Sequence, residues 1–309
     1  VASGDWWQTQ ADLMQAGNLR AACVAACVLP ALSACRQVSP PATVMTDAGN
    51  GAVIFARSTG RVARLMVVDP RGGPARPFGP MEGTVGDPAW STDGSELAFA
   101  WRRWPAGYQI AILDDRGNVR VLTDGSSIDA GPTWSPDGSR LAFARVAGPE
   151  PWLYLVPQRG GDLRPLAPGR APDWSPGGEA LAFERRAPTA SDLFTYDLAD
   201  GTVTAVVSSP ADDRDPDWSP DGSSIAFASD RDGDFDIYVL ELDGGRIRRI
   251  TDFPDDERWP AWSPGGREIA FARVSAASSS IWLVEADGSH GLPLTSGHWD
   301  GAPAWRPAP

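Results

Sequence analysis

Three residue types that support common kinds of site chemistry are scarce in this chain of 309 residues. Lysine is absent, so every basic side chain is an arginine. The three cysteines, Cys23, Cys27 and Cys35, lie in one apolar N-terminal segment without a nearby histidine, which argues against a zinc site. His290 and His298 are the only histidines. We therefore assign no catalytic residue, no metal ligand and no cofactor.

Positive charge is also in deficit. The 27 basic residues face 40 acidic ones, which gives a net charge of −13. Nucleic-acid binding depends on cationic contacts to phosphates, so nucleic acid is excluded as a partner. The acidic balance favours solubility, a basic partner or divalent cations, and we expect a monomer.

One short phrase recurs along the chain and predicts the architecture. Copies of Pro-x-Trp-Ser-Pro-Asp/Gly-Gly, the last of them truncated, are centred on Trp90, Trp134, Trp174, Trp218, Trp262 and Trp305. These tryptophans are 44, 40, 44, 44 and 43 residues apart. A period of about 40–45 residues built from short strands is typical of a β-propeller blade.

The residues around each phrase predict a four-stranded meander. Pro and Gly after the Trp indicate a tight turn in which Gly takes a positive φ. An alternating strand follows, as in Leu97-Ala-Phe99 and Ile225-Ala-Phe227. A further apolar strand, a Gly-containing turn and a short fourth strand complete the unit, as in the hairpin closed by Asp243-Gly244.

The two ends of the repeat array are incomplete in complementary ways. The first unit begins at Gly51 with the second strand of the pattern, and the phrase at Trp305 is a first strand without successors. We expect the two fragments to pair, which removes the exposed sheet edges. The prediction is an all-β, six-bladed propeller of antiparallel blades over residues 49–309.

The phrase Trp-Ser-Pro-Asp-Gly followed by apolar-Ala-Phe resembles the repeat of TolB-like propellers. The run from Phe227 to Leu240, Phe-Ala-Ser-Asp-Arg-Asp-Gly-Asp-Phe-Asp-Ile-Tyr-Val-Leu, is similar to the same repeat. The resemblance covers about 260 of the 309 residues. TolB carries an α/β domain ahead of its propeller, whereas some fifteen residues separate the leader from the first strand here. The resemblance therefore implies a free-standing TolB-like propeller domain.

The front of the chain is typical of a lipoprotein leader. Arg20 precedes a short apolar run, and Leu32-Ser-Ala-Cys35 forms a lipobox. We interpret residues 1–34 as a signal segment whose true start is Met14, and residues 35–48 as the lipidated Cys35 with a flexible linker. An ordinary cleaved signal and a short anchor helix are the alternatives. The prediction is an extracytoplasmic protein that meets the membrane through its lipid alone.

One face of the expected propeller gathers aromatic, acidic and basic side chains. The candidate partner-binding residues are Trp259, Trp299, His298, Asp255, Asp256, Arg145, Arg185 and Arg273. The aromatic side chains would anchor a partner, and the arginines would hold carboxylates or phosphates. Trp104 and loop acids such as Asp124 and Asp129 belong to the same expected face.

The arginines of this set come from one repeat position, two residues past each strand-two Phe. That position holds Arg57, Trp101, Arg145, Arg185, Ser229 and Arg273. If the repeat is symmetric, the four arginines among these residues form a partial cationic ring. The alternative is that arginine and aspartate pair between blades and the loop acids are solvated.

The segment 230–236 carries Asp230, Asp232, Asp234 and Asp236 and resembles a calcium loop. The glutamate at the twelfth place, Glu241, falls in a strand rather than in a helix, unlike an EF-hand. We favour a hairpin turn over a cation site, and a cation in the propeller channel stays open as well.

Two classes of function follow. The first is a non-catalytic, envelope-anchored scaffold that binds a protein or cell-wall-associated partner through one face. The second is a hydrolase or lyase that uses carboxylates at the channel mouth. A sugar-binding module based on Trp259 and Trp299 is a third possibility. The sequence lacks the Gly-x-Ser-x-Gly elbow of the peptidases that carry propellers, which favours the first class.

Overall fold

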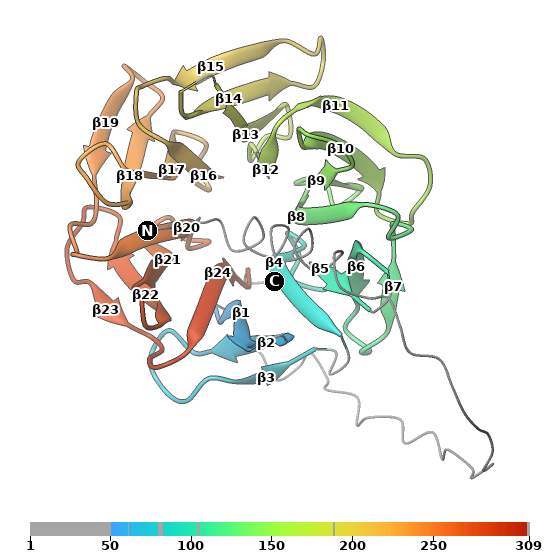
Figure 1. Cartoon of the computed structure of the whole chain (residues 1–309), viewed down its shortest axis with the longest axis horizontal. Helices are drawn as coiled ribbons and strands as arrows, with labels where there is room; N and C mark the ends of the chain where they lie inside the picture. The colour runs from blue at the N-terminus through green and yellow to red at the C-terminus, as the bar shows by residue number, and fades with distance from the viewer. Residues whose placement is uncertain (1–50, 61, 80–82, 104–105, 188, 308–309) are drawn as a thin grey trace, which may run out of the picture. The chain divides into compact units, whose positions relative to one another are not determined.

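The repeats fold into antiparallel sheets set around a common centre (Figure 1). The computed structural model describes residues 51–307 except 61, 80–82, 104–105 and 188. Each of the first four sheets, which we call blades I to IV, is one unit of the repeat. Blade I contains β4 (Thr84–Trp90), β5 (Leu97–Arg102), β6 (Tyr108–Leu113) and β7 (Val119–Val121). Blade II contains β8 (Ile128–Trp134), β9 (Arg140–Val146), β10 (Trp152–Pro157) and β11 (Arg164–Pro168).

The next two sheets repeat this order. Blade III contains β12 (Arg170–Trp174), β13 (Ala180–Arg186), β14 (Ser191–Asp197) and β15 (Val203–Val207). Blade IV contains β16 (Asp213–Trp218), β17 (Ser224–Ser229), β18 (Asp236–Glu241) and β19 (Arg246–Arg249). The strand that ends in the repeat Trp is the innermost strand each time, because it meets the matching strands of both neighbouring blades.

The remaining strands form blades V and VI, which share one continuous sheet. Blade V contains β20 (Asp256–Trp262), β21 (Glu268–Val274), β22 (Ser279–Glu285) and β23 (Leu292–Pro293). Blade VI contains β24 (Trp299–Trp305), β1 (Val53–Thr59), β2 (Val62–Val68) and β3 (Arg76–Phe78). The two blades are joined by a single parallel pair, Ser279 with Trp299.

Blade VI closes the ring, as the sequence predicts. The C-terminal strand β24 pairs antiparallel with β1, and Val53 lies opposite Trp305 while Ser58 lies opposite Trp299. Beyond the strands, Gly51 N–H donates to the Arg306 carbonyl at 3.0 Å and Arg306 N–H donates to the Ala52 carbonyl at 2.9 Å. The six-bladed all-β propeller is thus confirmed.

Every inner strand bends at the same place, three residues before the Trp. The residues there all have a positive φ: Asp87, Gly131, Ala171, Asp215, Trp259 and Ala302. The strand pairing slips at this point in each blade, which defines a β-bulge. Five of the six residues are not glycine, so the surrounding sheet holds an unfavourable backbone conformation.

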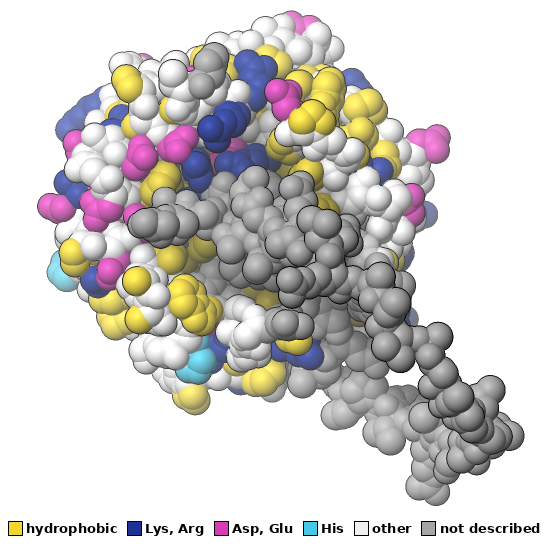
Figure 2. Space-filling view, viewed as in Figure 1, with side chains coloured by type: hydrophobic (Ala, Val, Ile, Leu, Met, Phe, Trp, Pro, Cys, Tyr) yellow, Lys and Arg dark blue, Asp and Glu magenta, His cyan; other side chains and the backbone are white. Residues whose placement is uncertain are grey.

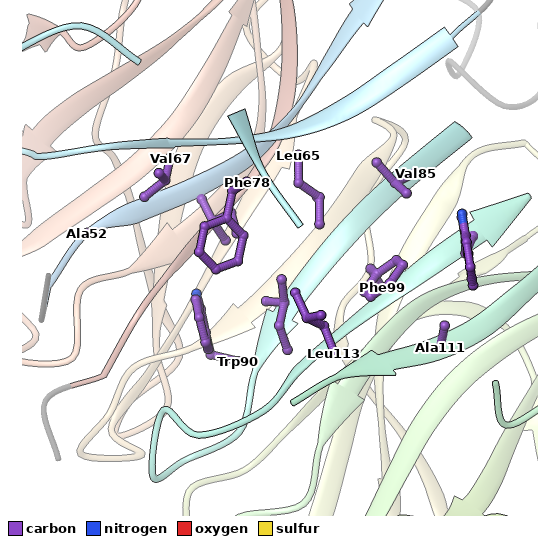
Figure 3. Packing of buried hydrophobic residues seen from close by; sticks show 12 residues of the cluster. Ala52, Leu65, Val67, Phe78, Val85, Trp90, Phe99, Ala111 and Leu113 are labelled. Carbon is purple, nitrogen blue, oxygen red and sulfur yellow. The ribbon is translucent and has the colours of Figure 1, made fainter. Parts of the chain in front are cut away.

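The phenylalanine of each second strand is fully buried. These residues are Phe55, Phe99, Phe143, Phe183, Phe227 and Phe271, each with 0% exposure. The alternating alanines let neighbouring sheets approach, so the core lies between blades. Figure 3 shows this at the junction of blades VI and I, where Leu65 and Phe78 meet Trp90 and Phe99. Each buried large side chain contributes roughly 1.5–3 kcal/mol.

Two of the repeat tryptophans also form hydrogen bonds to the preceding blade. Trp134 Nε1 donates to the Ala89 carbonyl of the preceding blade at 3.1 Å, and Trp305 Nε1 donates to the Ala261 carbonyl at 2.9 Å. The turn that follows each Trp is built as expected, since Gly94 and Gly222 take φ values of 67° and 73°.

Some sequence predictions fall outside the described residues. The signal segment, Cys35 with its linker, and Trp104 are among them. Within the described ranges, no helix is long and apolar enough to cross a membrane.

Replacement of Trp305 by alanine should destabilise the ring at its closure. The side chain is 9% exposed and hydrogen-bonded across two blades, so we expect a loss of about 3–5 kcal/mol in the free energy of unfolding. The matched control is Trp299→Ala on the same strand. Trp299 is 46% exposed, and the expected change is within about 0.5 kcal/mol. Equal losses in urea unfolding would contradict this account of closure.

Candidate functional site

The expected ring of arginines is present in position but is neutralised by acids. Arg57 Nε lies 2.6 Å from Asp300 Oδ1, and Arg145 Nε lies 2.7 Å from Asp129 Oδ1. Both aspartates are at most 1% exposed and stand near the start of an inner strand. Each pair joins two strands of one blade, whereas the sequence alternative expected pairs between blades. These arginines hold buried carboxylates in place and carry no surplus positive charge.

The other positions of this ring differ in detail. In blade IV, where the position is Ser229, Arg231 lies 2.7 Å from the buried Asp213. In blade V, Arg273 binds Asp255 at 2.8 Å. In blade III, Arg185 stacks on Phe194 with its guanidinium carbon 4.0 Å from the ring centre. Arg185 is thus held by an aromatic ring instead of a buried acid.

Arg145→Ala should cost far more stability than Arg185→Ala. Removing Arg145 leaves Asp129 buried without its counter-ion, and breaking a buried pair costs about 3 kcal/mol or more. Removing Arg185 loses an aromatic stacking contact worth about 0.5–1 kcal/mol. Thermal unfolding of the two variants at pH 7 measures the difference, and similar midpoints would show that the two arginines are equivalent.

Two of the predicted aromatic residues, Trp259 and Trp299, lie on the inner strands of the adjoining blades V and VI. Trp259 packs against Gly301, where an added Cβ would approach the indole to 3.1 Å. Gly301 is two residues from Trp299, which is 46% exposed. His298 is exposed beside it, and its Nδ1 lies 2.6 Å from the Ser296 carbonyl, so Nδ1 is the protonated nitrogen. We call these three residues the tryptophan rim: Trp259, which is partly buried, and His298 and Trp299, which are exposed.

The predicted acids of this face are tied into the fold. Asp255 accepts from Arg273 Nε at 2.8 Å, and Asp256 Oδ1 accepts the Phe235 N–H at 3.2 Å. They lie in blade V together with Arg273, near the tryptophan rim. Arg145 and Arg185 belong to blades II and III and lie elsewhere around the ring. Six of the eight predicted residues thus lie in or beside blades V and VI, and two arginines lie apart from them.

The segment 230–236 is a hairpin connection, since β17 and β18 pair on either side of it. Its carboxylates serve separate protein groups. Asp230 Oδ1 accepts the Asp212 N–H, Asp232 Oδ2 accepts the Tyr238 hydroxyl, and Asp236 Oδ2 accepts from Arg249. Within the residues that the structure describes, no three acids, histidines or cysteines gather as a metal site.

A second set of arginines, not predicted from the sequence, lies on the inner strands. Arg170, Arg214 and Arg258 stand four residues before the Trp in blades III, IV and V, where the other blades have Gly86, Ala130 and Gly301. Figure 2 shows basic side chains gathered close to the ring centre over blades III and IV. We call these three residues the inner arginine arc. The repeat offset of four residues was the signal that could have revealed them.

The inner arginine arc is anchored by acids and by one aromatic ring. Arg170 Nε donates to Glu184, which is 2% exposed. Arg214 lies 2.8 Å from Asp212, and Arg258 lies 3.3 Å from Asp215.

Two of these guanidinium groups lie against the Phe235 ring. The Arg258 guanidinium carbon is 4.2 Å and the Arg214 carbon is 5.3 Å from the Phe235 ring centre. Two of the three arginines of the arc therefore depend on the position of Phe235, which directly precedes β18 in the blade IV hairpin.

Two aspartates of the inner strands, Asp173 and Asp217, are held by backbone donors of the neighbouring blade. Asp173 Oδ2 accepts the Trp218 N–H at 2.8 Å, and Asp217 Oδ2 accepts the Trp262 N–H at 2.7 Å, each from the next blade. Burial, opposed by the hydrogen bonds from Trp218 and Thr133, raises the pKa of Asp173 to about 6. Burial and the charge of Asp173 raise the pKa of Asp217 as well.

Asp173→Asn should make the propeller more stable above pH 6. A folded-state pKa above the ordinary value means that stability declines as pH rises from about 4 through 6. The amide removes that decline, and with about 1.4 kcal/mol per pKa unit we expect a gain of roughly 1–2 kcal/mol at pH 8.

The control is Asp137→Asn in the blade II turn. Hydrogen bonds from Ser135 and Ser139 lower the pKa of Asp137 to about 2. Its contribution to stability is therefore present at neutral pH and lost in acid, so Asp137→Asn should destabilise at pH 8. The measurement is the unfolding midpoint of each variant between pH 4 and 8. If both midpoints shifted in the same direction from the wild-type midpoint at pH 8, the raised pKa of Asp173 would be refuted.

Residues 167–309, which hold blades III to V and strand β24, match the family model described as the TolB beta propeller domain. The chain contains a TolB-like β-propeller domain. No curated protein sequence matches the chain.

Solved structures confirm the propeller fold of the TolB-like domain. TolB from Acinetobacter baumannii is 20% identical with a TM-score of 0.73, and the match covers 83% of this chain and 67% of that protein. A putative TolB from Agrobacterium tumefaciens is 24% identical with a TM-score of 0.66 over 82% and 91% of the two chains. The tricorn protease is 20% identical with a TM-score of 0.62, but only 26% of its chain is covered.

Proposed function

We propose that this TolB-like propeller is a non-catalytic scaffold of the cell envelope that binds a protein or cell-wall-associated partner through the tryptophan rim. The observation that carries the proposal is the exposure of Trp299, at 46%, on the strand that closes the ring. An indole in this position is held by the sheet rather than by a flexible loop. Tryptophan is among the residues that dominate binding energy at protein interfaces.

The surroundings of the tryptophan rim favour binding over simple solvation. Trp259 contacts Gly301, and the Arg258 guanidinium carbon lies 5.7 Å from the centre of its indole ring. A rigid aromatic surface loses little conformational entropy when a partner docks. The net charge of −13 adds long-range attraction for a partner with basic groups.

The envelope location rests on the leader and on the likeness to proteins named TolB. Lipidation of Cys35 would tether the propeller to a membrane surface and leave its faces free. Mass spectrometry of the mature N-terminus tests this part by itself. A diacylglycerol-modified Cys35 is the expected result, and an unmodified N-terminus elsewhere would remove the anchor from the proposal.

One group of residues has the composition of a catalytic triad but not its geometry. His290 Nδ1 lies 2.9 Å from Ser289 Oγ and 3.2 Å from Glu285 Oε1. A triad needs the serine on one ring nitrogen and the acid on the other. Here both groups meet the same nitrogen, and the His290 side chain is 75% exposed. This arrangement favours a turn contact over nucleophilic catalysis.

Alanine variants of the tryptophan rim test the binding role. Trp259→Ala and Trp299→Ala should each reduce capture of the partner from solubilised membranes at least tenfold, with the fold unchanged by circular dichroism. Alanine fits the positive φ of Trp259, because Ala171 and Ala302 occupy the same bulge in other blades.

Trp152→Ala is the matched control for these variants. Trp152 is 42% exposed, close to the exposure of Trp299, but it belongs to blade II. Its loss should leave capture intact. Equal capture by all three variants would remove the tryptophan rim as the binding surface. Retention of glycans instead of protein on the wild type, lost in Trp299→Ala, would identify a sugar-binding module.

A further inference from the structure

Blade V lacks a buried aspartate–arginine pair that three other blades share. In blades II, IV and VI, the inner-strand residue five places before the Trp is a buried aspartate paired with an arginine of its own blade: Asp129, Asp213 and Asp300. In blade V the same place holds Glu257, which is 0% exposed. Its partner in the strand register is Arg273. Arg273, however, points its guanidinium at Asp255, so Glu257 is left without the expected cation.

Glu257 instead faces a second buried acid across the junction of two blades. Asp236, at the start of β18 in blade IV, is also 0% exposed and lies within hydrogen-bonding reach of Glu257. Among the described residues, neither oxygen of the Glu257 carboxyl group receives a hydrogen bond, and Asp236 Oδ1 receives none. Two ionised carboxylates offer only acceptors to one another, so the contact lacks a donor.

The groups around the pair supply one positive charge for two carboxyl groups. Arg249 lies 2.6 Å from Asp236 Oδ2 and is shared with the exposed Asp252 at 2.7 Å. The Thr251 hydroxyl and the Phe253 amide lie beside Glu257 without completing a hydrogen bond to its oxygens. Among the described residues, Asp234, Tyr238 and Arg273 also face the pair, and the charge of Arg273 is taken up by Asp255. A second buried negative charge without a partner costs several kcal/mol.

We propose that Glu257 and Asp236 share one proton at neutral pH, and that this proton fastens the blade IV hairpin to blade V. The protonated carboxyl group supplies the missing donor and removes the second buried charge in one step. Burial, followed by the charge of Asp236, raises the pKa of Glu257 to about 9, which agrees with the geometry.

A proton fits this place better than a metal ion does. A divalent cation such as calcium takes six to eight oxygen ligands. The pair offers two carboxyl groups beside a guanidinium, and the part of the chain that the structure describes holds no group of three acidic, histidine or cysteine ligands.

The proton acts on more than the two carboxyl groups. Next to the pair, Glu257 N–H donates to the Phe235 carbonyl at 2.5 Å and Phe235 N–H donates to Asp256 Oδ1 at 3.2 Å. Phe235 in turn supports Arg214 and Arg258 of the inner arginine arc. When the proton leaves, two like charges repel across this seam. The hairpin 230–235 and the segment 251–257 then separate, and Arg214 and Arg258 lose their contact with the Phe235 ring.

Unfolding midpoints between pH 5 and 10 test the shared proton. Because the folded-state pKa is raised, wild-type stability should fall as pH rises from about 4.5 to 9, and the proton should be lost above 9. Glu257→Gln keeps the shape and supplies a permanent donor. We expect its midpoint to lie above that of the wild type at pH 9.5 and to change less over this range.

Asp129→Asn is the matched control, because it makes the same kind of change at the same repeat position. There the carboxylate is paired with Arg145, so the amide should lower the midpoint throughout this pH range. A Glu257→Gln midpoint lowered at pH 7 as in Asp129→Asn would overturn the proposal. So would a calcium-dependent rise of the wild-type midpoint that Glu257→Gln lacks, since it would place a cation between the carboxylates.

Two measurements on the wild type keep the test independent of any variant. Infrared spectra should show a protonated carboxyl band at pH 7 that disappears above pH 9. Hydrogen exchange of residues 230–236 and 251–258, corrected for the intrinsic rate, should accelerate by up to tenfold per pH unit as pH rises toward 9 and should level off above 9. Absence of the band at pH 7, or exchange in these segments no faster than in blade II, would contradict the shared proton.

Discussion

The pairing of β24 with β1 is the interaction on which the other features depend. It joins residues more than 200 positions apart in the chain, as the contact of Arg57 with Asp300 shows. Without it, blade VI has no inner strand and two sheet edges stand open. The same pairing sets Gly301 against Trp259 and holds Trp299 at the surface. Ring closure and the proposed binding surface therefore have one physical cause.

Burial at the start of the inner strands explains why the arginines do not form a free cationic ring. A buried carboxylate needs a counter-ion, and the residue opposite it in the antiparallel register is the arginine, as for Asp129 and Arg145. The pairing is local to a blade because strands one and two are hydrogen-bonded neighbours. Charge at this level stabilises single blades, so the proposed binding surface rests on the tryptophans instead.

The sequence predicts what depends on repetition and fails where one copy differs. The Trp period, the glycine turns and the incomplete ends were enough for six blades and their closure, because each follows from backbone geometry. The pairing of Arg145 with Asp129 required the strand register, which a list of equivalent arginines does not contain. The inner arginine arc could have been read from its offset before Trp174, Trp218 and Trp262. The contact between Glu257 and Asp236 could not, because it joins different positions of two repeats.

Departures from the repeat are concentrated in blades III to VI, and they are connected in space. Phe235 lies between the shared carboxyl pair and the arginine arc, Arg258 lies between Phe235 and Trp259, and Trp259 rests on the closing strand. A six-fold scaffold requires none of these residues, since blade I folds with Val85, Gly86 and Asp87 in the places of Glu257, Arg258 and Trp259. Residues that the repeat does not need, yet that contact one another from the hairpin to the rim, are where a specific partner can distinguish one blade from the next.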